Sequence, residues 1–429
     1  MDEYSGYKGR SLQFLKENKA KIGDHVEIQA DEIYSGSLMP RYEQGDDQHI
    51  VLKLKSGYNI GIDLNTIDKI KIKTPSQRKE EDIKEIKENP ELPKILLLTT
   101  GGTIASKIDY RTGAVTPTLT AAELYESIPE LSEIANIDTE ILFSEYSENI
   151  TPDHWLKIAN RLNQLADSDY KGILVAHGTD TMQYTSSFLS FALAGFPIPI
   201  ALVGSQRSSD RPSSDATMNL LSAAKFLTSN DLKGIFVVMH YGKSDNVIAS
   251  HIGTRVRKNH TSKRGAFETI GDKPAFLLYE DKTERNFKRE YFENSEYTPR
   301  INLNTKSALI KYYPGFDPKI IEYLIKDGFK AIIFEGTGLG HVGKKMYDVV
   351  KKANDAGIFL GMTSQCIDGR VNMNVYESGR DLVNLGITPL KDMIPETALV
   401  KSMWAIGNYE GKEAIKKIML QRIASEISD

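Results

Sequence analysis

Hydrophobic and polar positions alternate over short stretches in the first part of the chain, which is the pattern of β-strands with one buried face. Glycine, aspartate and serine separate these stretches and are typical of tight turns. We expect residues 1–73 to form a small all-β barrel domain, serving as a packing adaptor or contacting RNA. The five predicted strands are His25–Ile28, Ile33–Met39, His49–Leu54, Asn59–Asp63 and Asp68–Ile72.

Dense mixed charge follows in residues 74–93, which contain RKEEDIKEIKE and then Pro90 and Pro93. This composition predicts a charged linker, with or without one exposed helical stretch.

From Lys94 onward, runs that are apolar at nearly every position replace the alternating ones. Such runs, separated by helical segments, indicate a parallel sheet covered on both faces. A polar stretch near residues 297–306 divides them into two series, so we expect an α/β body with domains at 94–300 and 301–429. The predicted strands are Ile95–Thr99, Ile141–Tyr146, Gly172–Ala176, Ile200–Gly204, Ile235–His240, Ala308–Tyr312, Ala331–Phe334 and Ile358–Met362.

Local signals place some helices and exclude a membrane span. Thr120 and Glu123 have capping-box spacing, and Thr151-Pro152 predicts a second helix start with proline in its first turn. The apolar stretch from Phe188 to Gly204 is too short for a span and is interrupted by Gly195 and two prolines. We therefore predict a helix end, a turn and a buried strand there, and no membrane segment. The first ten residues lack the apolar core of a secretory signal peptide.

Composition narrows the class of protein. The chain is 40% hydrophobic, 26% charged and 9% aromatic, which is globular composition. A net charge of −4 gives no electrostatic basis for binding nucleic acid without a partner protein. The single cysteine, Cys366, excludes a disulfide framework and a thiolate metal cluster, and is typical of the reducing cytoplasm.

Two of the predicted strands end in residues that could react with or bind a ligand, at the edge where parallel sheets bind ligands. The first end reads Thr100-Gly101-Gly102-Thr103. Its glycines would let backbone N–H groups approach a ligand, and a hydroxyl follows. A tight turn with capping threonines explains the same residues.

The second end reads His177-Gly178-Thr179-Asp180 and precedes a predicted helix, whose N-terminus favours an anion or a developing oxyanion. Asp180 could equally be a simple N-cap of that helix.

Taken together, TGGTIAS after one strand and HGTDTM after another resemble the bacterial-type L-asparaginase family of amidohydrolases, and the resemblance extends over residues 94–429. It implies that Thr103, Thr179, Asp180 and Lys258 act in catalysis, with Tyr110 assisting Thr103. It also implies that Ser147 and Glu148 bind the α-amino and α-carboxylate groups of the substrate.

The implied chemistry is physically reasonable. A threonine hydroxyl is a weak nucleophile and needs a base, which a lysine made neutral by burial could supply (Lys258, held by Asp180 through Thr179). Backbone amides around Gly102 and Thr103, or around Gly178 and Thr179, could bind the oxyanion. The order of the two threonines stays open, with Thr103 favoured as the first to attack. Without the resemblance, Lys258 in RVRKNHTSKR would be interpreted as a solvated lysine.

A glycine-rich turn in the second domain imitates a nucleotide-binding motif. Gly338, Gly340 and Gly343 fit GxGxxG, but Lys345 stands where a P-loop needs serine or threonine. No acidic residue closes the next predicted strand, so we do not interpret this turn as a nucleotide site. In asparaginases the turn can carry an asparagine that reaches the neighbouring protomer's site, whereas this chain has Leu339 and Gly340 there.

Simple asparaginases lack an N-terminal barrel of this size followed by a charged linker. The segments Val203–Ala216 and Thr254–Phe267 resemble the D subunits of archaeal glutamyl-tRNA(Gln) amidotransferases, and with the barrel included this resemblance covers essentially the whole chain. This resemblance implies a cytoplasmic glutaminase that supplies ammonia to a partner protein, the E subunit. The partner would activate glutamyl-tRNA with ATP and Mg²⁺, and would bind most of the tRNA. No cofactor or metal is expected in this chain itself.

The resemblance further implies a homodimer of this chain, within a heterotetramer. A stand-alone cytoplasmic asparaginase or glutaminase is the main alternative, and an inactive adaptor protein is another. The presence of Thr103, Thr179, Asp180 and Lys258 together argues against an inactive adaptor.

Overall fold

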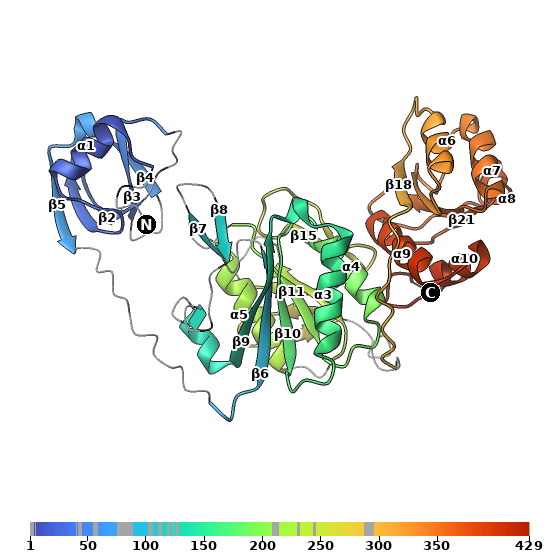
Figure 1. Ribbon diagram of the computed structural model, residues 1–429, viewed down its shortest axis with the longest axis horizontal. Helices are drawn as coiled ribbons and strands as arrows, with labels where there is room; N and C mark the ends of the chain where they lie inside the picture. Colours follow the sequence, from blue (N-terminus) through green and yellow to red (C-terminus); the bar gives the residue numbers. More distant parts are fainter. Residues whose placement is uncertain are drawn as a thin grey trace.

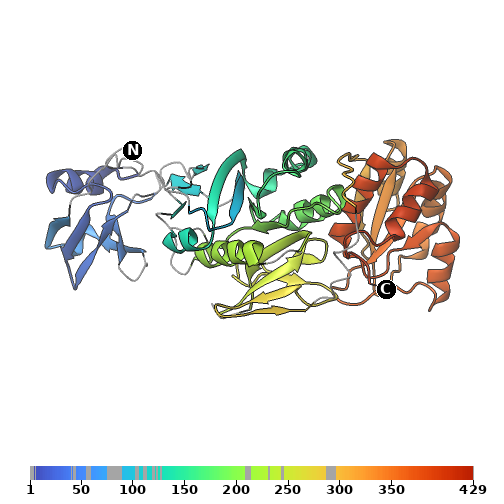
Figure 2. The same ribbon diagram turned by 90° about the horizontal axis from the view of Figure 1, so that it is seen from below.

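The computed structural model describes residues 4, 6–39, 41, 45–54, 59–74, 89–101, 106–109, 114–117, 121, 124–125, 128–207, 214–229, 232–242, 246–286 and 296–428. Three main sheets follow one another along the longest axis (Figure 1). Seen from below, the central lobe separates the N-terminal module from the C-terminal lobe (Figure 2). No helix in these ranges is long and apolar enough to cross a membrane.

The N-terminal module is a five-stranded antiparallel sheet in the order β4-β3-β2-β1-β5. Alternate residues of its strands, such as Val26 and Ile28, enclose a small apolar core with Leu15. The strand predictions are confirmed within two residues at each end. The strands are β1 (His25–Gln29), β2 (Ile33–Leu38), β3 (His49–Leu54), β4 (Asn59–Asp63) and β5 (Lys69–Thr74).

The module also contains a helix that the strand pattern did not predict, α1 (Gly9–Glu17). It begins at Lys8 without a side-chain cap and buries only Ser11 and Leu15. Both signals that usually mark a helix in a sequence, a capping residue and an apolar stripe, are therefore weak here. Most of the predicted linker (75–88) and the predicted capping box at Thr120 and Glu123 lie outside the described residues.

The central lobe (residues 94–286) is built on an eight-stranded sheet in the order β17-β16-β13-β12-β11-β10-β6-β9. The five predicted strands are its parallel part, but β9 begins at Asn136, five residues before the predicted start at Ile141. Three further strands extend one edge antiparallel, so this sheet is mixed, not purely parallel. The bounds are β6 (Lys94–Gly101), β9 (Asn136–Glu145), β10 (Gly172–Ala176), β11 (Ile200–Val203), β12 (Ile235–His240), β13 (Ile248–Ile252), β16 (Phe276–Leu278) and β17 (Thr283–Arg285).

Both faces are buried in the middle of this sheet, which is why β6, β10, β11 and β12 are apolar at consecutive positions. On β6, Leu96 and Leu98 belong to one core cluster, and Ile95 and Leu97 belong to the other. Helices α3 (Pro152–Gln164) and α4 (Met182–Ala192) cover the first face; α5 (Ala216–Ser229) and the 3-10 turn η2 (Pro129–Glu133) cover the second. The predicted start of α3 is confirmed, with Thr151 and His154 forming a capping box.

Two small hairpins flank the sheet. β7 (Ser106–Asp109) pairs with β8 (Ala114–Pro117), and β14 (Val256–Lys258) pairs with β15 (Phe267–Thr269).

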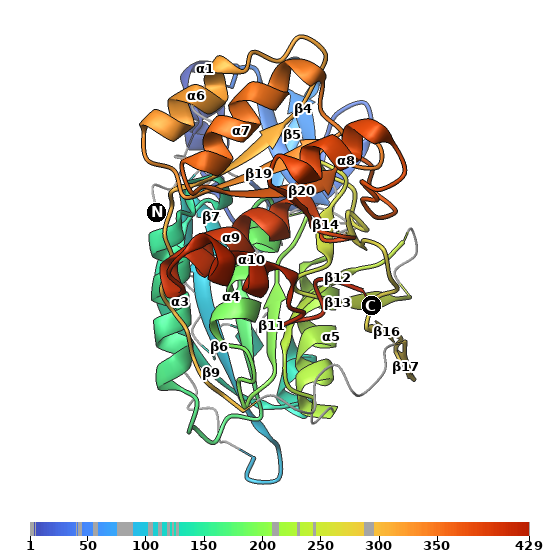
Figure 3. The ribbon, with the colours of Figure 1, turned by 90° about the vertical axis from the view of Figure 1, so that its right-hand side faces the viewer.

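The C-terminal lobe carries a four-stranded parallel sheet, β18-β19-β20-β21. One face packs on α6, α7 and α8, while the other, through Ile333 and Phe359, joins the cluster that includes Leu98 of the central lobe. The two lobes thus share one continuous core, with α9 lying across α4 (Figure 3). The bounds are β18 (Ser307–Lys311), α6 (Lys319–Lys326), β19 (Ala331–Gly336), η5 (Lys344–Met346), α7 (Tyr347–Asp355), β20 (Phe359–Ser364), α8 (Glu377–Asn384), β21 (Ile387–Pro389), α9 (Pro395–Asn408) and α10 (Lys412–Leu420).

After α10, residues 421–428 run back across both lobes and form the C-terminal tail. Thr254 donates a hydrogen bond to the Ala424 carbonyl (2.7 Å). Arg255 donates from Nε to the Ser425 carbonyl (2.6 Å), and its guanidinium pairs with Asp392 of the C-terminal lobe (3.1 Å). The tail therefore ties the segment just before β14 to the second lobe.

The tail also holds a fully buried ion pair between Lys401 of α9 and Glu426. Burial lowers the pKa of Lys401, and the Glu426 carboxylate opposes this effect. The Lys401 ammonium also donates to the Met419 and Gln421 carbonyls, and Glu426 accepts N–H bonds from the tail backbone. Every polar group of the pair thus has a partner, which a buried charge requires.

Glu426→Gln is expected to lower the free energy of unfolding by about 3–5 kcal/mol, because it leaves the Lys401 ammonium buried without a countercharge. Asp355→Asn provides the control, since it breaks the exposed Lys351–Asp355 pair at i,i+4 spacing and should cost less than about 0.5 kcal/mol. Denaturant unfolding of the three proteins measures the difference. Equal stabilities of the two variants would contradict the assigned role of the pair.

Candidate active site

The loop after the carboxyl end of β10 is the second of the two candidate site segments expected from the sequence. His177 follows the strand and is fully buried; its Nδ1–H donates to the Gly178 carbonyl (2.7 Å), and Nε2 accepts from Thr185 (2.9 Å). Burial lowers the pKa of His177 to about 4, so the ring is neutral near pH 7. Both ring nitrogens are engaged, and His177 therefore shapes the loop rather than exchanging protons with a substrate.

Lys258, Thr179 and Asp180 meet at this loop. The Lys258 ammonium, at the end of β14, donates to Thr179 Oγ1 (2.8 Å) and to Asp180 Oδ1 (2.6 Å). The lysine side chain is only 9% exposed, whereas the Asp180 side chain is 65% exposed. A hydroxyl is thus in direct contact with a nearly buried amine, beside a carboxylate that is open to solvent.

Ser147, in the 3-10 turn η3 (Ser147–Asn149) after β9, supports the same loop from the neighbouring edge. Its hydroxyl accepts the Asp180 N–H (3.1 Å), and its carbonyl accepts the Thr181 hydroxyl (2.7 Å). A Cβ at Gly178 would lie 2.4 Å from that of Ser147, so only glycine allows this approach. Glu148 is exposed, directly after this buried serine.

The first strand end is described only in part. Thr100 donates to the Ala176 carbonyl (2.8 Å), which ties the end of β6 to the end of β10. Gly101 has φ +113°, and a Cβ there would collide with the backbone of Glu145. Gly102, Thr103 and Tyr110 lie outside the described residues. The described residues resume in the hairpin β7–β8, where Asp109 pairs with Ala114.

One residue of the site was not predicted from the sequence. Gln183, in the first turn of α4, accepts the backbone N–H of Lys258 at its Oε1 (2.7 Å). The sequence offers no signal for its partner 75 residues away.

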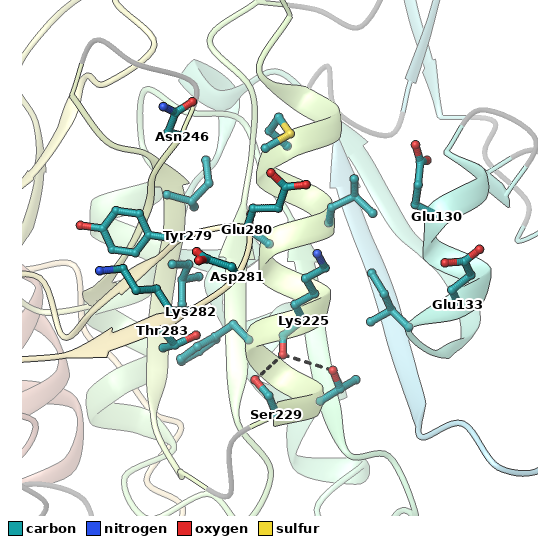
Figure 4. A pocket seen from close by; sticks show the side chains of 18 residues that line it. Glu130, Glu133, Lys225, Ser229, Asn246, Tyr279, Glu280, Asp281, Lys282 and Thr283 are labelled. Carbon is teal, nitrogen blue, oxygen red and sulfur yellow. Dashed lines mark hydrogen bonds between the residues drawn. The ribbon is translucent and has the colours of Figure 1, made fainter.

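Other features of the chain take no part in the hydrogen bonds of this site. The glycine-rich turn after β19 closes on itself through a bridge between Thr337 and His341. In the described ranges no three His, Cys, Asp or Glu side chains gather as a metal site would require. A groove of about 1160 Å³ lies over α5, with Glu130 and Glu133 on one side and Tyr279–Thr283 on the other (Figure 4). None of its lining residues belongs to the Lys258 site.

Comparison with known proteins decides the family. Family models match three consecutive parts of the chain: the GatD N-terminal domain matches residues 20–72; Asparaginase, N-terminal, matches 94–291; and the Glutaminase/Asparaginase C-terminal domain matches 307–419. The glutamyl-tRNA(Gln) amidotransferase D subunit of Sulfolobus acidocaldarius is 47% identical over 425 residues, which cover 98% of this chain and 95% of the relative. The chain belongs to the D-subunit family of glutamyl-tRNA(Gln) amidotransferases. The D subunit of Pyrococcus abyssi is 44% identical, with 97% of each chain covered.

Solved structures place the body of this D-subunit family member among the asparaginases. The thermostable L-asparaginase from Thermococcus kodakarensis superimposes with a TM-score of 0.70 at 32% identity and covers 78% of this chain and 99% of its own. The asparaginase-like α/β body with a preceding all-β region is thereby confirmed. The resemblance to the D subunits stated from the sequence is confirmed as well.

Proposed function

We propose that this chain is the glutaminase component of a tRNA-dependent amidotransferase. It hydrolyses L-glutamine to glutamate and ammonia, and the ammonia converts Glu-tRNA(Gln) to Gln-tRNA(Gln). The observation that carries the chemistry is the contact of Lys258 with Thr179 and Asp180 at 2.8 and 2.6 Å. The observation that carries the biological context is 47% identity to a D subunit over nearly the whole chain.

The first half of the proposed reaction is acyl transfer to a threonine. A hydroxyl oxygen attacks the side-chain amide carbon of glutamine, and its proton passes to a base. Across the 2.8 Å contact, an unprotonated Lys258 amine can take the proton of Thr179. The order of Thr103 and Thr179 in the attack is a separate proposal, in which Thr103 is first. Backbone N–H groups near Gly102 or Gly178 bind the oxyanion.

The second half releases both products. The tetrahedral intermediate collapses, the C–N bond breaks, and the leaving amine takes a proton from the protonated base and departs as ammonia. Water then attacks the threonine ester and releases glutamate, which restores the hydroxyl. Ser147 fixes the Asp180 backbone during these steps, and Ser147 with the exposed Glu148 is proposed to receive the α-substituents of glutamine.

The partners follow from the reaction. Activation of the glutamyl group needs a second protein, the E subunit, which is proposed to hold ATP and Mg²⁺ and to bind most of the tRNA, while this chain needs no cofactor. A homodimer of this chain within a heterotetramer would give the partner two equivalent docking surfaces. Because aminoacyl-tRNA is used in translation, the proposed location of the complex is the cytoplasm.

A stand-alone asparaginase is the second candidate, favoured by the asparaginase-like body. Ammonia release from glutamine and from asparagine separates the two, measured with and without the E subunit carrying glutamyl-tRNA. The loaded partner should raise kcat/KM for glutamine by about 10-fold or more, equivalent to about 1.4 kcal/mol. Equal rates with and without it, or a preference for asparagine, would favour the stand-alone enzyme. No hydrolysis under any condition would favour the adaptor.

A further inference from the structure

Gln183 lies where the helix and the strand of the active site meet. It is three residues after Asp180 and four after Thr179, in the first turn of α4, and its side chain is 7% exposed. A buried amide in this position is costly unless its polar atoms are bonded. Its partners therefore indicate what the residue does.

The oxygen of the Gln183 amide accepts the backbone N–H of Lys258 at 2.7 Å. β14 is only three residues long, and the next residue, Asn259, already directs its N–H to Ala266 on the other side of the hairpin. The Lys258 N–H thus points away from β15, and Gln183 is the group that receives it.

The Gln183 amide also acts on the neighbouring phenol of Tyr184. Burial raises the pKa of Tyr184, and a hydrogen bond from Gln183 acts in the opposite direction. The contact that the structure fixes is the one to Lys258, so Gln183 is an acceptor for that backbone on the helix that follows Thr179 and Asp180.

We propose that Gln183 is a positioning residue for the reaction, holding the backbone of Lys258 so that its amine reaches Thr179 and Asp180 together. The inference rests on the proposed glutaminase activity. The lysine and its two partners belong to separate elements, 78 and 79 residues apart. The flexible lysine stem alone does not fix their distance, because it has four rotatable bonds. The Gln183 contact supplies a second link between the same two elements.

The test compares two substitutions at Gln183 in the full chain with its partner protein. Gln183→Met keeps the length and loses the acceptor, and should lower kcat for glutamine by about 10- to 100-fold, the effect expected of a displacement near 1 Å. KM should change little, because the Gln183 side chain is buried and its oxygen is bonded to the Lys258 backbone. Gln183→Glu retains an acceptor oxygen and should recover most of the lost kcat.

Ser190→Ala serves as the matched control. It removes another buried hydrogen bond of α4, from Ser190 to the Ser186 carbonyl, without touching Lys258, and should leave kcat unchanged. Thermal unfolding of all variants records any general loss of stability. Equal kcat in Gln183→Met and the unsubstituted chain, or an equal loss in Gln183→Glu, overturns the positioning role while leaving the glutaminase function intact. An unsubstituted chain that releases no ammonia overturns both.

Discussion

Lys258→Met is expected to lower kcat/KM for glutamine by about 10²- to 10⁴-fold, the contribution of a positioned general base. The substitution removes the amine that contacts Thr179 and Asp180 and keeps the length of the stem. Asp180 then loses its partner, but its side chain is 65% exposed, so water can solvate the carboxylate. The fold should therefore persist, and ammonia release measures the loss.

Lys263→Met is the control for this experiment. Lys263 belongs to the same basic run but is exposed, and its backbone N–H bonds to His260. Its removal should leave the rate unchanged. Near-normal activity of Lys258→Met, with Lys263→Met equally active, would show that the lysine of β14 is not the base.

Thr179→Val should lower kcat by about 10³-fold or more, since loss of a nucleophile or of its proton relay commonly costs several orders of magnitude. Valine exchanges the hydroxyl for a methyl group and keeps the branched shape, so the loop from His177 to Thr181 retains its other contacts. We expect the same loss for Thr103→Val. Trapping the acyl-enzyme with hydroxylamine then identifies which variant fails to form it.

Thr228→Val tests whether any threonine would give this effect. Thr228 lies near the end of α5 and donates to the Ala224 carbonyl, far along the chain from β10. Full activity is expected. If Thr179→Val retained wild-type kcat as well, the hydroxyl at position 179 would have no part in the reaction.

The elements that could be predicted are those whose burial produces a hydrophobic pattern over several residues of the sequence. β6 and β10 are apolar at consecutive positions because each face meets its own core cluster, and this pattern is visible in the sequence. The antiparallel extension was not predicted, since β16 and β17 are only three residues long. Too few residues alternate in such strands to reveal a period. The helix α1 was missed for a different reason, because it has no side-chain cap and buries only Ser11 and Leu15.

Only the site residues that belong to a recognisable sequence motif could be predicted. Thr179 and Asp180 follow a strand end, which sequence reasoning can locate, whereas Lys258 was identified by family resemblance alone. Hydrogen bonds between distant elements leave no local trace, so Gln183 was not found. Ser147 was expected to bind substrate, and in the structure its hydroxyl and carbonyl are bonded to the loop of Asp180.

The C-terminal tail can make its contacts with the central lobe only at the end of translation. Thr254 and Arg255 directly precede β14, and their partners Ala424 and Ser425 are translated 170 residues later. At a synthesis rate of about 5–20 residues per second, that interval is roughly 8–35 seconds. During it, the segment that carries Lys258 lacks the contacts that anchor its start. A nascent chain can therefore form the sheet of its central lobe and the Gln183 contact to Lys258 well before the tail anchors the start of β14, so this anchor is among the last contacts to form as the chain leaves the ribosome.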